Sequence, residues 1–443
     1  MSDVTAKEIL QLVEEEDVEF IRLQFVDILG NMKNVAITSS QLERALTRGC
    51  MFDGSSIEGF VQIEESDMCL KPDLSTLAIF PWRPQQGKVA RLICDVYRPD
   101  GSPFDGDPRY ILKKEIEAAA KEGFVLEAGP ESEFFLFDTD ESGQPTTHTN
   151  EKAGYFDMGP VDFGENARRD IVLTLEDMGF VVVASHHEMG PGQHGVDLSY
   201  EEALKAADEM MTFKLAVKTV AKNHGLHATF MPKPKMDTFG SGLHLNLSLA
   251  KDGVNIFGDA ADENGLSKEA YYFMGGLLKH MKGITAIANP IVNSYKRLAG
   301  GLGTPKHIAW SRTNRSALIR IPSTSTDHAR IELRNPDGTT NPYLLLALCL
   351  RAGMDGIRNQ IMPPAAVQAN INEMTAQQMQ EKHIEALPLN LKEALAEMEN
   401  DPMIRDVLGE HLYQNYLKYK KKEWDDYSSQ VSDWEVAQYL LNV

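Results

Sequence analysis

The feature that most constrains the fold is the segment 242–249, where leucine alternates with polar residues. Four leucines take every second position, and His244, Asn246 and Ser248 lie between them. Side chains two apart on a strand share a face, so the pattern predicts a strand with one buried apolar face and one polar face. Residues 330–334 repeat it, with two apolar residues opposite an arginine–glutamate–arginine row. Both segments therefore belong to a sheet that collects polar side chains on one side.

Other apolar runs also carry carboxylates or arginines. Glu131 and Glu133 precede the apolar residues 134–137, and residues 314–320 place two arginines beside an apolar strand. Oxygen ligands with one imidazole suit Mg²⁺ or Mn²⁺, and guanidinium groups suit phosphate or carboxylate. Any one of these side chains is more simply explained as an ordinary ion pair or a packed structural residue. Several such rows in one sheet indicate a possible site for a metal, a polyphosphate and an amino-acid carboxylate.

The chain has 443 residues, more than one hydrophobic core usually supports. Its first hundred residues predict a small mixed or antiparallel sheet with little helix: a helix at 8–16 and strands at 20–28, 32–37 and 89–96. The turn-rich residues 98–103 favour a domain boundary. We therefore expect one domain at 1–102 and a second at 103–443.

The second domain mixes strong helices with strands, which is typical of the α+β class. Asp107 and Asn341 each precede a proline that suits the first turn of a helix. Ser199 with Glu202 predicts a capping box. The expected helices lie at 108–123, 165–178, 199–225 and from 341 and 388 onward, and the expected strands at 181–184, 242–249, 317–321 and 329–334.

The charge, the cysteine spacing and the hydropathy of the chain exclude several classes of function. The 44 basic and 65 acidic residues give a net charge of −21, which argues against a general affinity for nucleic-acid backbones. The four cysteines have no metal-like spacing and are typical of reduced thiols. No segment resembles a signal peptide or approaches the roughly 18 apolar residues of a membrane span. We expect a cytoplasmic protein that binds neither nucleic acid nor membrane.

Ordered motifs then identify a family. They lie at residues 51–57, 129–135, 186–194, 228–234, 240–244, 293–298, 314–316 and 341–344. In sequence and in order, they resemble the motifs of class I glutamine synthetases, in the form common in Gram-positive bacteria. The resemblance runs from about residue 20 to the C-terminal helices.

This resemblance implies an α+β fold, with a small β-grasp-like N-terminal domain and a large catalytic domain whose sheet forms a funnel. It implies an ATP-dependent glutamate–ammonia ligase that forms glutamine through γ-glutamyl phosphate. Two or three Mg²⁺ or Mn²⁺ ions would clamp the phosphates. The implied partners are ATP, glutamate, ammonium and further copies of the chain, in a dodecamer with active sites between subunits.

The motifs also imply roles for individual residues. Glu133 and Glu188 resemble ligands of a first metal, and Glu131, His244 and Glu332 resemble ligands of a second. By the same resemblance, Arg315, Arg320 and Arg334 would hold phosphoryl oxygens and the glutamate acceptor, and Arg297 and Gly240 would contact glutamate. Ser248 and Arg330 would lie near the nucleotide. Asp53 would bind ammonium across the subunit interface.

Three positions depart from the family pattern. Gly195 replaces a glutamate that completes the first metal site, and its loss should weaken metal binding unless water or Asp197 compensates. Gly303 replaces a glutamate of the substrate-closing loop, which removes a candidate base and leaves the loop rich in glycine. Phe239 replaces an asparagine that touches substrate. Elsewhere, Gln62 replaces an arginine linked to feedback inhibition.

These departures leave three interpretations open. The substitutions can be single changes in an active glutamine synthetase. They can belong to a γ-glutamyl ligase for another amine, for which ammonium-specific groups are dispensable. They can also mark a catalytically impaired homologue with a binding or regulatory role. Retention of the remaining carboxylates and arginines argues against complete loss of metal and nucleotide binding.

Overall fold

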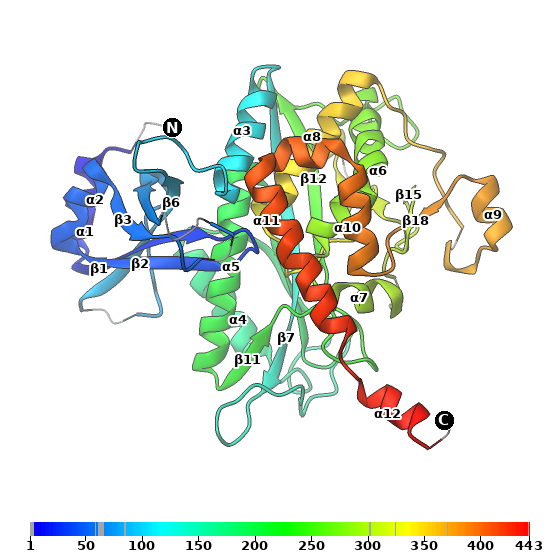
Figure 1. Ribbon diagram of the computed structural model, residues 1–443, viewed down its shortest axis with the longest axis horizontal. Helices are drawn as coiled ribbons and strands as arrows, with labels where there is room; N and C mark the ends of the chain where they lie inside the picture. The colour runs from blue at the N-terminus through cyan, green and yellow to red at the C-terminus, as the bar shows by residue number, and fades with distance from the viewer. Residues whose placement is uncertain are drawn as a thin grey trace.

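The computed structural model describes residues 4–57, 59–60, 66–83, 86–300, 303–323, 325–369, 371–441 and 443. Gln62 lies outside the described residues. Figure 1 shows a small N-terminal part beside a larger body of helices and strands. The α+β class expected from the sequence is confirmed.

The N-terminal part is a six-stranded sheet with two helices, α1 (Ala6–Glu15) and α2 (Leu42–Arg48). Its strand order is β2-β1-β6-β4-β3, with β5 also paired to β6; β1 and β6 run parallel and the other pairs antiparallel. The strands are β1 (Val18–Val26), β2 (Met32–Thr38), β3 (Cys50–Asp53), β4 (Asp67–Pro72), β5 (Ala78–Ile79) and β6 (Lys88–Tyr97). The predicted mixed sheet is therefore confirmed.

A ten-stranded sheet forms the centre of the larger part. Its order is β15-β16-β17-β12-β7-β9-β8, with β10 and β11 paired to β7 and β13 paired to β12. The strands are β7 (Phe124–Asp138), β8 (Val182–His187), β9 (Gln193–Leu198), β10 (Glu201–Glu202), β11 (Leu226–Thr229), β12 (Leu243–Lys251), β13 (Val254–Asn255), β15 (Trp310–Ser311), β16 (Ile319–Arg320) and β17 (Ile331–Leu333); a separate pair joins β14 (His307–Ile308) to β18 (Glu385–Ala386).

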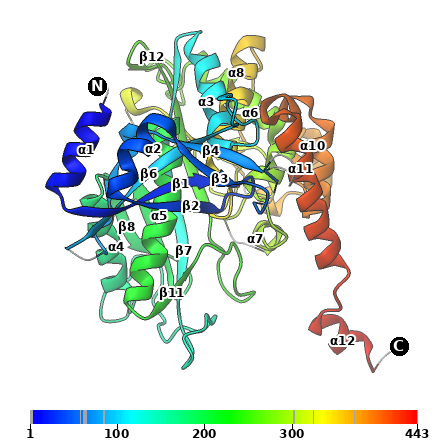
Figure 2. The same ribbon diagram turned by 60° about the vertical axis from the view of Figure 1, so that its left-hand side comes forward.

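Helices bury the apolar side of this sheet. The leucines that alternate along β12 belong to the same hydrophobic core as α6 and α8, and the helix α12 projects away from the body in two views (Figures 1 and 2). The helices are α3 (Pro108–Ala120), α4 (Glu165–Asp177), α5 (Ala203–Asn223), α6 (Lys268–Ala288), α7 (Ser294–Gly300), α8 (Pro342–Asn359), α9 (Ala376–Glu381), α10 (Leu391–Asn400), α11 (Pro402–Ser428) and α12 (Asp433–Tyr439). None of the helices in the described ranges is long and apolar enough to cross a membrane.

The predicted capping box at Ser199 and Glu202 is wrong. Residues Glu201–Glu202 instead form β10, which pairs with Ala128 and Glu127 of β7. Helix α5 then begins at Ala203 without a side-chain cap. Pairing with a long central strand satisfies backbone groups that a local cap would otherwise have to satisfy. The predicted strand at 317–321 is also shorter than expected, because only Ile319–Arg320 pairs as β16.

A buried arginine joins the two parts of the chain. Arg109 of α3 is 3% exposed and donates two hydrogen bonds to Asp208 of α5, at 3.0 and 2.8 Å. It also donates to Asp95 of β6 at 2.7 Å and to Asp73, next to β4, at 2.8 Å. One guanidinium therefore neutralises carboxylates from both sides of the junction.

Replacing Arg109 with alanine is expected to destabilise the chain by about 3–5 kcal/mol, because it leaves buried carboxylates without their counter-charge. Thermal unfolding of the purified protein measures the effect. Arg405→Ala is the matched control, since Arg405 pairs with Glu410 at 2.7 Å on the surface and exposed pairs contribute little. Equal unfolding temperatures for the two variants would contradict this account of the junction.

Candidate active site

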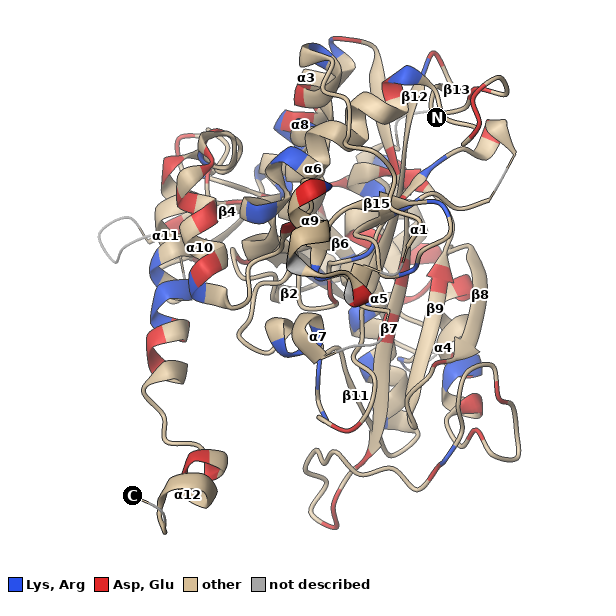
Figure 3. Cartoon of the chain, turned by 90° about the vertical axis from the view of Figure 1, so that its right-hand side faces the viewer, with Lys and Arg blue, Asp and Glu red and all other residues tan. Residues whose placement is uncertain are grey.

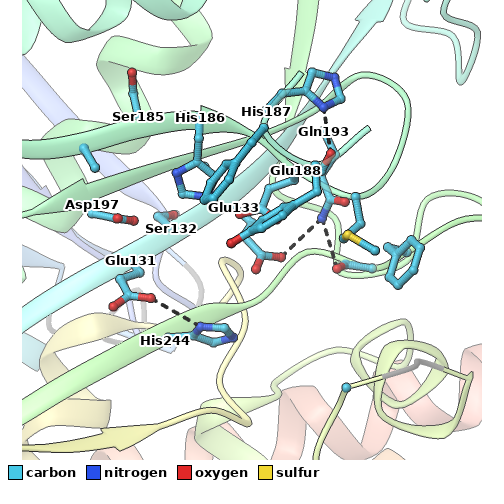
Figure 4. Close-up of a pocket in the computed structure, with 18 of the residues that line it drawn as sticks. Glu131, Ser132, Glu133, Ser185, His186, His187, Glu188, Gln193, Asp197 and His244 are labelled. Carbon is cyan, nitrogen blue, oxygen red and sulfur yellow. Dashed lines mark hydrogen bonds and ion pairs between the residues drawn. The ribbon is translucent and has the colours of Figure 1, made fainter. Parts of the chain in front are cut away.

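The polar face of the ten-stranded sheet borders a cavity of about 920 Å³, a size suited to small-molecule substrates. Figure 4 shows carboxylates and imidazoles of this face pointing toward one another. Most of the predicted site residues line the cavity: Glu131, Glu133, Glu188, Gly240, His244, Arg297, Arg315, Arg320, Glu332 and Arg334.

Strand register gathers the residues predicted to hold the second metal. His244 of β12 lies opposite Glu131 of β7, and Asn246 lies opposite Glu332 of β17. The Nδ1 atom of His244 is 3.5 Å from a carboxylate oxygen of Glu131 and 3.4 Å from one of Glu332. The alternating leucines of β12 are at most 2% exposed, so the two faces predicted from the sequence are confirmed.

Charge around this cluster is balanced between carboxylates and arginines. Glu332 is fully buried, and its two oxygens accept hydrogen bonds from Arg320 and Arg334. Burial alone would raise the pKa of Glu131, but hydrogen bonds from His244 and Asn246 outweigh it and lower that pKa to about 2. Glu131 is therefore ionised at neutral pH, as a metal ligand must be.

The two residues predicted to hold the first metal face the same cavity. Glu133 accepts hydrogen bonds from the backbone N–H of Gly242 at 2.8 Å and from Gln193 Nε2 at 3.2 Å. Glu188 Oε1 lies 2.7 Å from His186 Nε2. Burial raises the pKa of Glu188, and the negative charge of Glu133 raises it further. The hydrogen bond with His186 lowers this pKa but only partly offsets the rise. The two carboxylates thus act on each other across the cavity.

Gly195 occupies the middle of a row across three strands. It lies opposite Glu133 of β7 on one side and opposite His186 of β8 on the other (Figure 3 shows β7, β9 and β8 side by side). A Cβ atom at position 195 would come within 2.8 Å of Glu188 Oε1 and 2.9 Å of His186 Nε2. An imidazole and a carboxylate therefore fill the space that a side chain at this position would enter.

The second glycine departure lies on the loop that borders the cavity. Gly303 has φ +76°, a conformation that favours glycine, and its carbonyl oxygen accepts a hydrogen bond from Arg334 Nη2 at 3.4 Å. Among the described residues, apart from its neighbours in the chain, no atom lies within 4 Å of a Cβ atom placed there. Phe239 borders the same cavity and is partly exposed. Residues 301 and 302 of the loop lie outside the described residues.

Arg297 lines the cavity, and its guanidinium group donates hydrogen bonds to backbone carbonyl oxygens. It donates to the carbonyl oxygens of Asn335 at 2.8 Å, Pro336 at 3.1 Å and Arg334 at 3.2 Å. A Cβ atom at Gly240 would lie 2.9 Å from Cγ of Arg297. A residue other than glycine would therefore push against the arginine that braces the end of β17, which explains the glycine physically.

Asp53 lies outside the cavity lining, at the end of β3 in the N-terminal part. Its exposed carboxylate accepts hydrogen bonds from the backbone N–H and the hydroxyl of Ser55, at 2.8 and 2.7 Å. These bonds lower the pKa of Asp53. Its role toward ammonium stays a prediction.

Ser248 and Arg330 also lie outside the lining: Ser248 continues the polar row of β12, and Arg330 directly precedes β17. Ser248 is 2% exposed and donates to Glu127 Oε2 at 3.3 Å. Arg330 donates to Asn246 Oδ1 at 3.2 Å. Ser248 thus extends the row that begins at His244, and Arg330 contacts that row through Asn246. Their contact with a nucleotide stays a prediction.

Sequence reasoning gave no definite site role to several residues that line the cavity. Asp197 lies opposite Glu131 in β7, and burial with the charge of Glu131 raises the pKa of Asp197 to about 6. Its place two residues after Gly195 on a strand was a usable signal. Tyr155 and Phe156 also line the cavity, from a loop that no periodic pattern marks.

The donor sets fit hard divalent cations. Ligand atoms of Glu131, His244 and Glu332 all lie within 4.8 Å of one another, and carboxylates with one imidazole suit Mg²⁺ or Mn²⁺. Arginines beside the carboxylates suit phosphoryl or carboxylate groups. The cavity therefore combines side chains suited to a divalent cation with side chains suited to anions, the combination that phosphoryl transfer requires.

Comparisons with known proteins agree with this chemistry. The family model described as the glutamine synthetase β-grasp domain matches residues 17–99, and that of the glutamine synthetase catalytic domain matches residues 105–439. Glutamine synthetase of Clostridium saccharobutylicum is 57% identical over 440 residues, 99% of each chain.

Two solved structures have the same fold. A complex of GmaS with ADP is 34% identical, with a TM-score of 0.89 over 97% of this chain and 99% of that one. Plasmodium falciparum glutamine synthetase is 28% identical, with a TM-score of 0.88 over 99% of both chains. With both domain models matched and the metal and arginine rows in place, the chain belongs to the glutamine synthetase family.

Proposed function

We propose that this glutamate–ammonia ligase forms glutamine through γ-glutamyl phosphate, with ATP as the phosphoryl donor. A side-chain carboxylate oxygen of glutamate bonds to the γ-phosphorus while the bond from that phosphorus to ADP breaks. The nitrogen of ammonia then bonds to the acyl carbon, the bond to phosphate breaks, and the nitrogen loses a proton. The observation that carries this proposal is the contact of the Glu131–His244–Glu332 cluster with Arg320 and Arg334.

The arginines would hold the oxygens that carry charge in both steps. Arg334 is fixed by a hydrogen bond from its Nε to the carbonyl oxygen of Arg315 at 3.1 Å and by its pair with Glu332. A donor held in place before the reaction stabilises developing charge without further reorganisation. Arg315, Arg320 and Arg334 would bind the phosphoryl group, and Arg297 with Gly240 would border the glutamate.

The metal residues form two groups on adjoining strands. Glu131, His244 and Glu332 would hold one Mg²⁺ or Mn²⁺ ion, and Glu133 and Glu188 would contribute to the other. Bound ions neutralise phosphate charge and align the groups that react. Ser248 and Arg330 continue the row toward the proposed nucleotide end.

Assembly of several copies, as a dodecamer, belongs to the same proposal. Asp53 is exposed and lies outside the cavity lining, so a site between subunits would let Asp53 of a second copy bind ammonium. Helix α12 projects from the body (Figure 2). The side chains of Trp434, Leu440 and Leu441 are exposed. Four free cysteines agree with a cytoplasmic location.

Purified protein with ATP, glutamate, ammonium and Mn²⁺ is expected to form glutamine and phosphate in equal amounts. Oxygen-18 placed in the side-chain carboxylate of glutamate should appear in the phosphate, because the intermediate passes that oxygen to phosphorus. Glutamine without label transfer would contradict the intermediate. Phosphate release with small organic amines but not with ammonium would instead identify another amine as the acceptor.

A further inference from the structure

We propose that His186 is the third ligand of the first metal centre, in the place that a carboxylate at position 195 would take. The centre would then consist of Glu133, Glu188 and His186. This inference rests on the proposed function, because it assumes that Glu133 and Glu188 bind a metal ion. It concerns the glycine at position 195, which carries no side chain of its own.

The strand register places the His186 side chain where a metal-binding side chain of residue 195 would lie. Glu133, Gly195 and His186 are direct neighbours across β7, β9 and β8, so their side chains leave the same face of the sheet. With no side chain on Gly195, the His186 ring reaches over the central strand. Its Nε2 atom lies 2.7 Å from Glu188 Oε1 and 2.9 Å from the position of a Cβ on residue 195.

The chemistry of this pair suits a metal ligand. His186 Nε2 and Glu188 Oε1 face each other across a single hydrogen bond of 2.7 Å, so both atoms are directed at the same point in the cavity. A cation can replace the proton of this hydrogen bond, which passes to solvent, as metal binding to imidazole requires. The His186 side chain is partly buried and packs edge-on against Phe156 and Tyr155, with ring centroids 5.2 and 5.9 Å apart, so its ring is held in place.

Asp197 is the competing candidate for the missing ligand. It lies two residue pairs further along the same strands, opposite Glu131 and Ala184, and therefore in the row of the second metal centre. The nearest atoms to a Cβ on residue 195 belong to Glu188 and His186 rather than to Asp197, and it is His186 that forms the hydrogen bond with Glu188. Geometry among the described residues thus favours the histidine.

Replacing a carboxylate ligand of the first metal centre with an imidazole changes the relative affinity of the centre for Mn²⁺ and Mg²⁺. The centre loses one negative charge and gains a nitrogen ligand, and Mn²⁺ accepts nitrogen more readily than Mg²⁺ does. Mn²⁺ should therefore bind the first centre with greater preference over Mg²⁺ than in a variant with Glu at position 195. Gly195→Glu should shift the preference back toward Mg²⁺.

Mn²⁺ titration of the metal-stripped full-length protein, followed by electron paramagnetic resonance, tests the assignment. His186→Ala is expected to weaken one of two classes of Mn²⁺ site by at least about tenfold. His224→Ala is the matched control, because His224 pairs with Asp170 at 2.9 Å on the surface. In the Gly195→Glu background, His186→Ala should have little further effect.

Nitrogen coupling to bound Mn²⁺ provides a second readout that does not depend on turnover. His244→Ala removes the imidazole of the second centre, so coupling that persists in this variant and depends on His186 comes from the first centre, whereas coupling that does not depend on His186 would come from the buried cluster of Glu151, Asp162, His187 and His194. Adding His186→Ala should abolish the coupling that persists. Unchanged affinities in His186→Ala, or loss of a site in Asp197→Asn but not in His186→Ala, would overturn the assignment. Absence of all Mn²⁺ binding in the unmodified protein would instead contradict the proposed function.

Discussion

Replacing Glu332 with glutamine is expected to lower the rate of glutamine formation by about 10²–10³-fold. Glu332 is the fully buried carboxylate between Arg320, Arg334 and the imidazole of His244. An amide keeps the shape but has no charge, so the second centre would lose a ligand and both arginines would lose their partner. Steady-state rates at saturating ATP and glutamate, over a range of Mn²⁺ concentrations, measure the loss.

A matched control separates chemistry from stability. Glu115 of α3 is 5% exposed and forms two hydrogen bonds with Arg351 of α8, at 2.7 and 2.8 Å, and neither residue lines the cavity. Glu115→Gln therefore removes a comparable carboxylate–arginine pair. Both variants should lower the unfolding temperature, but only Glu332→Gln should reduce the rate of the folded protein and remove one Mn²⁺ site. Equal rate losses in the two variants would show that stability alone explains the effect.

Strand faces could be predicted from the sequence because alternation is a local property. The polar row of His244, Asn246 and Ser248 and the buried leucines opposite it follow from the period of a single strand. The contact of His244 with Glu332 does not follow from that period, since it depends on the pairing of β12 with β17. The motif resemblance alone predicts that His244 and Glu332 belong to one metal site.

Pairing between distant segments explains what local reasoning missed. The capping signal at Ser199 failed because residues 201–202 pair with β7, a partner about seventy residues earlier in the chain. His186 belongs to the motif at residues 186–194, but the motif alone assigns no chemical role to this histidine. Its importance appears only when register sets it beside Gly195 and Glu133. Tyr155 and Phe156 come from a loop, where neither period nor capping gives a signal.

Restoring carboxylates at both glycine departures is the second large effect. The double variant Gly195→Glu, Gly303→Glu is expected to increase the rate of glutamine formation by about 10²–10⁴-fold where proton transfer limits turnover. Position 303 would supply a base for the proton that leaves the ammonia nitrogen, and position 195 would exchange the proposed imidazole ligand of the first metal centre for a carboxylate. Rates at saturating ammonium, compared with the unmodified protein, measure the gain.

The two positions differ in how well they accept a side chain. At residue 195 the nearest atoms are the ends of the Glu188 and His186 side chains, and both must shift to admit a new side chain, His186 at the expense of its ring contacts with Tyr155 and Phe156. At residue 303 no atom from the described, non-adjacent part of the chain lies within 4 Å of an added Cβ, but φ of +76° costs a non-glycine residue on the order of 1 kcal/mol. Gly303→Glu should therefore lower the stability of the loop slightly while adding a reactive group.

Glutamine at the same positions provides the decisive control. Gly195→Gln and Gly303→Gln introduce nearly the same volume and the same backbone strain without a carboxylate. A gain with glutamate but not with glutamine would show that charge and proton transfer at these positions limit the reaction. An equal gain with both would assign the effect to loop rigidity. No gain with either would show that the chain already completes its metal centre and removes the ammonium proton with other residues, of which His186 and Asp53 are the first to test.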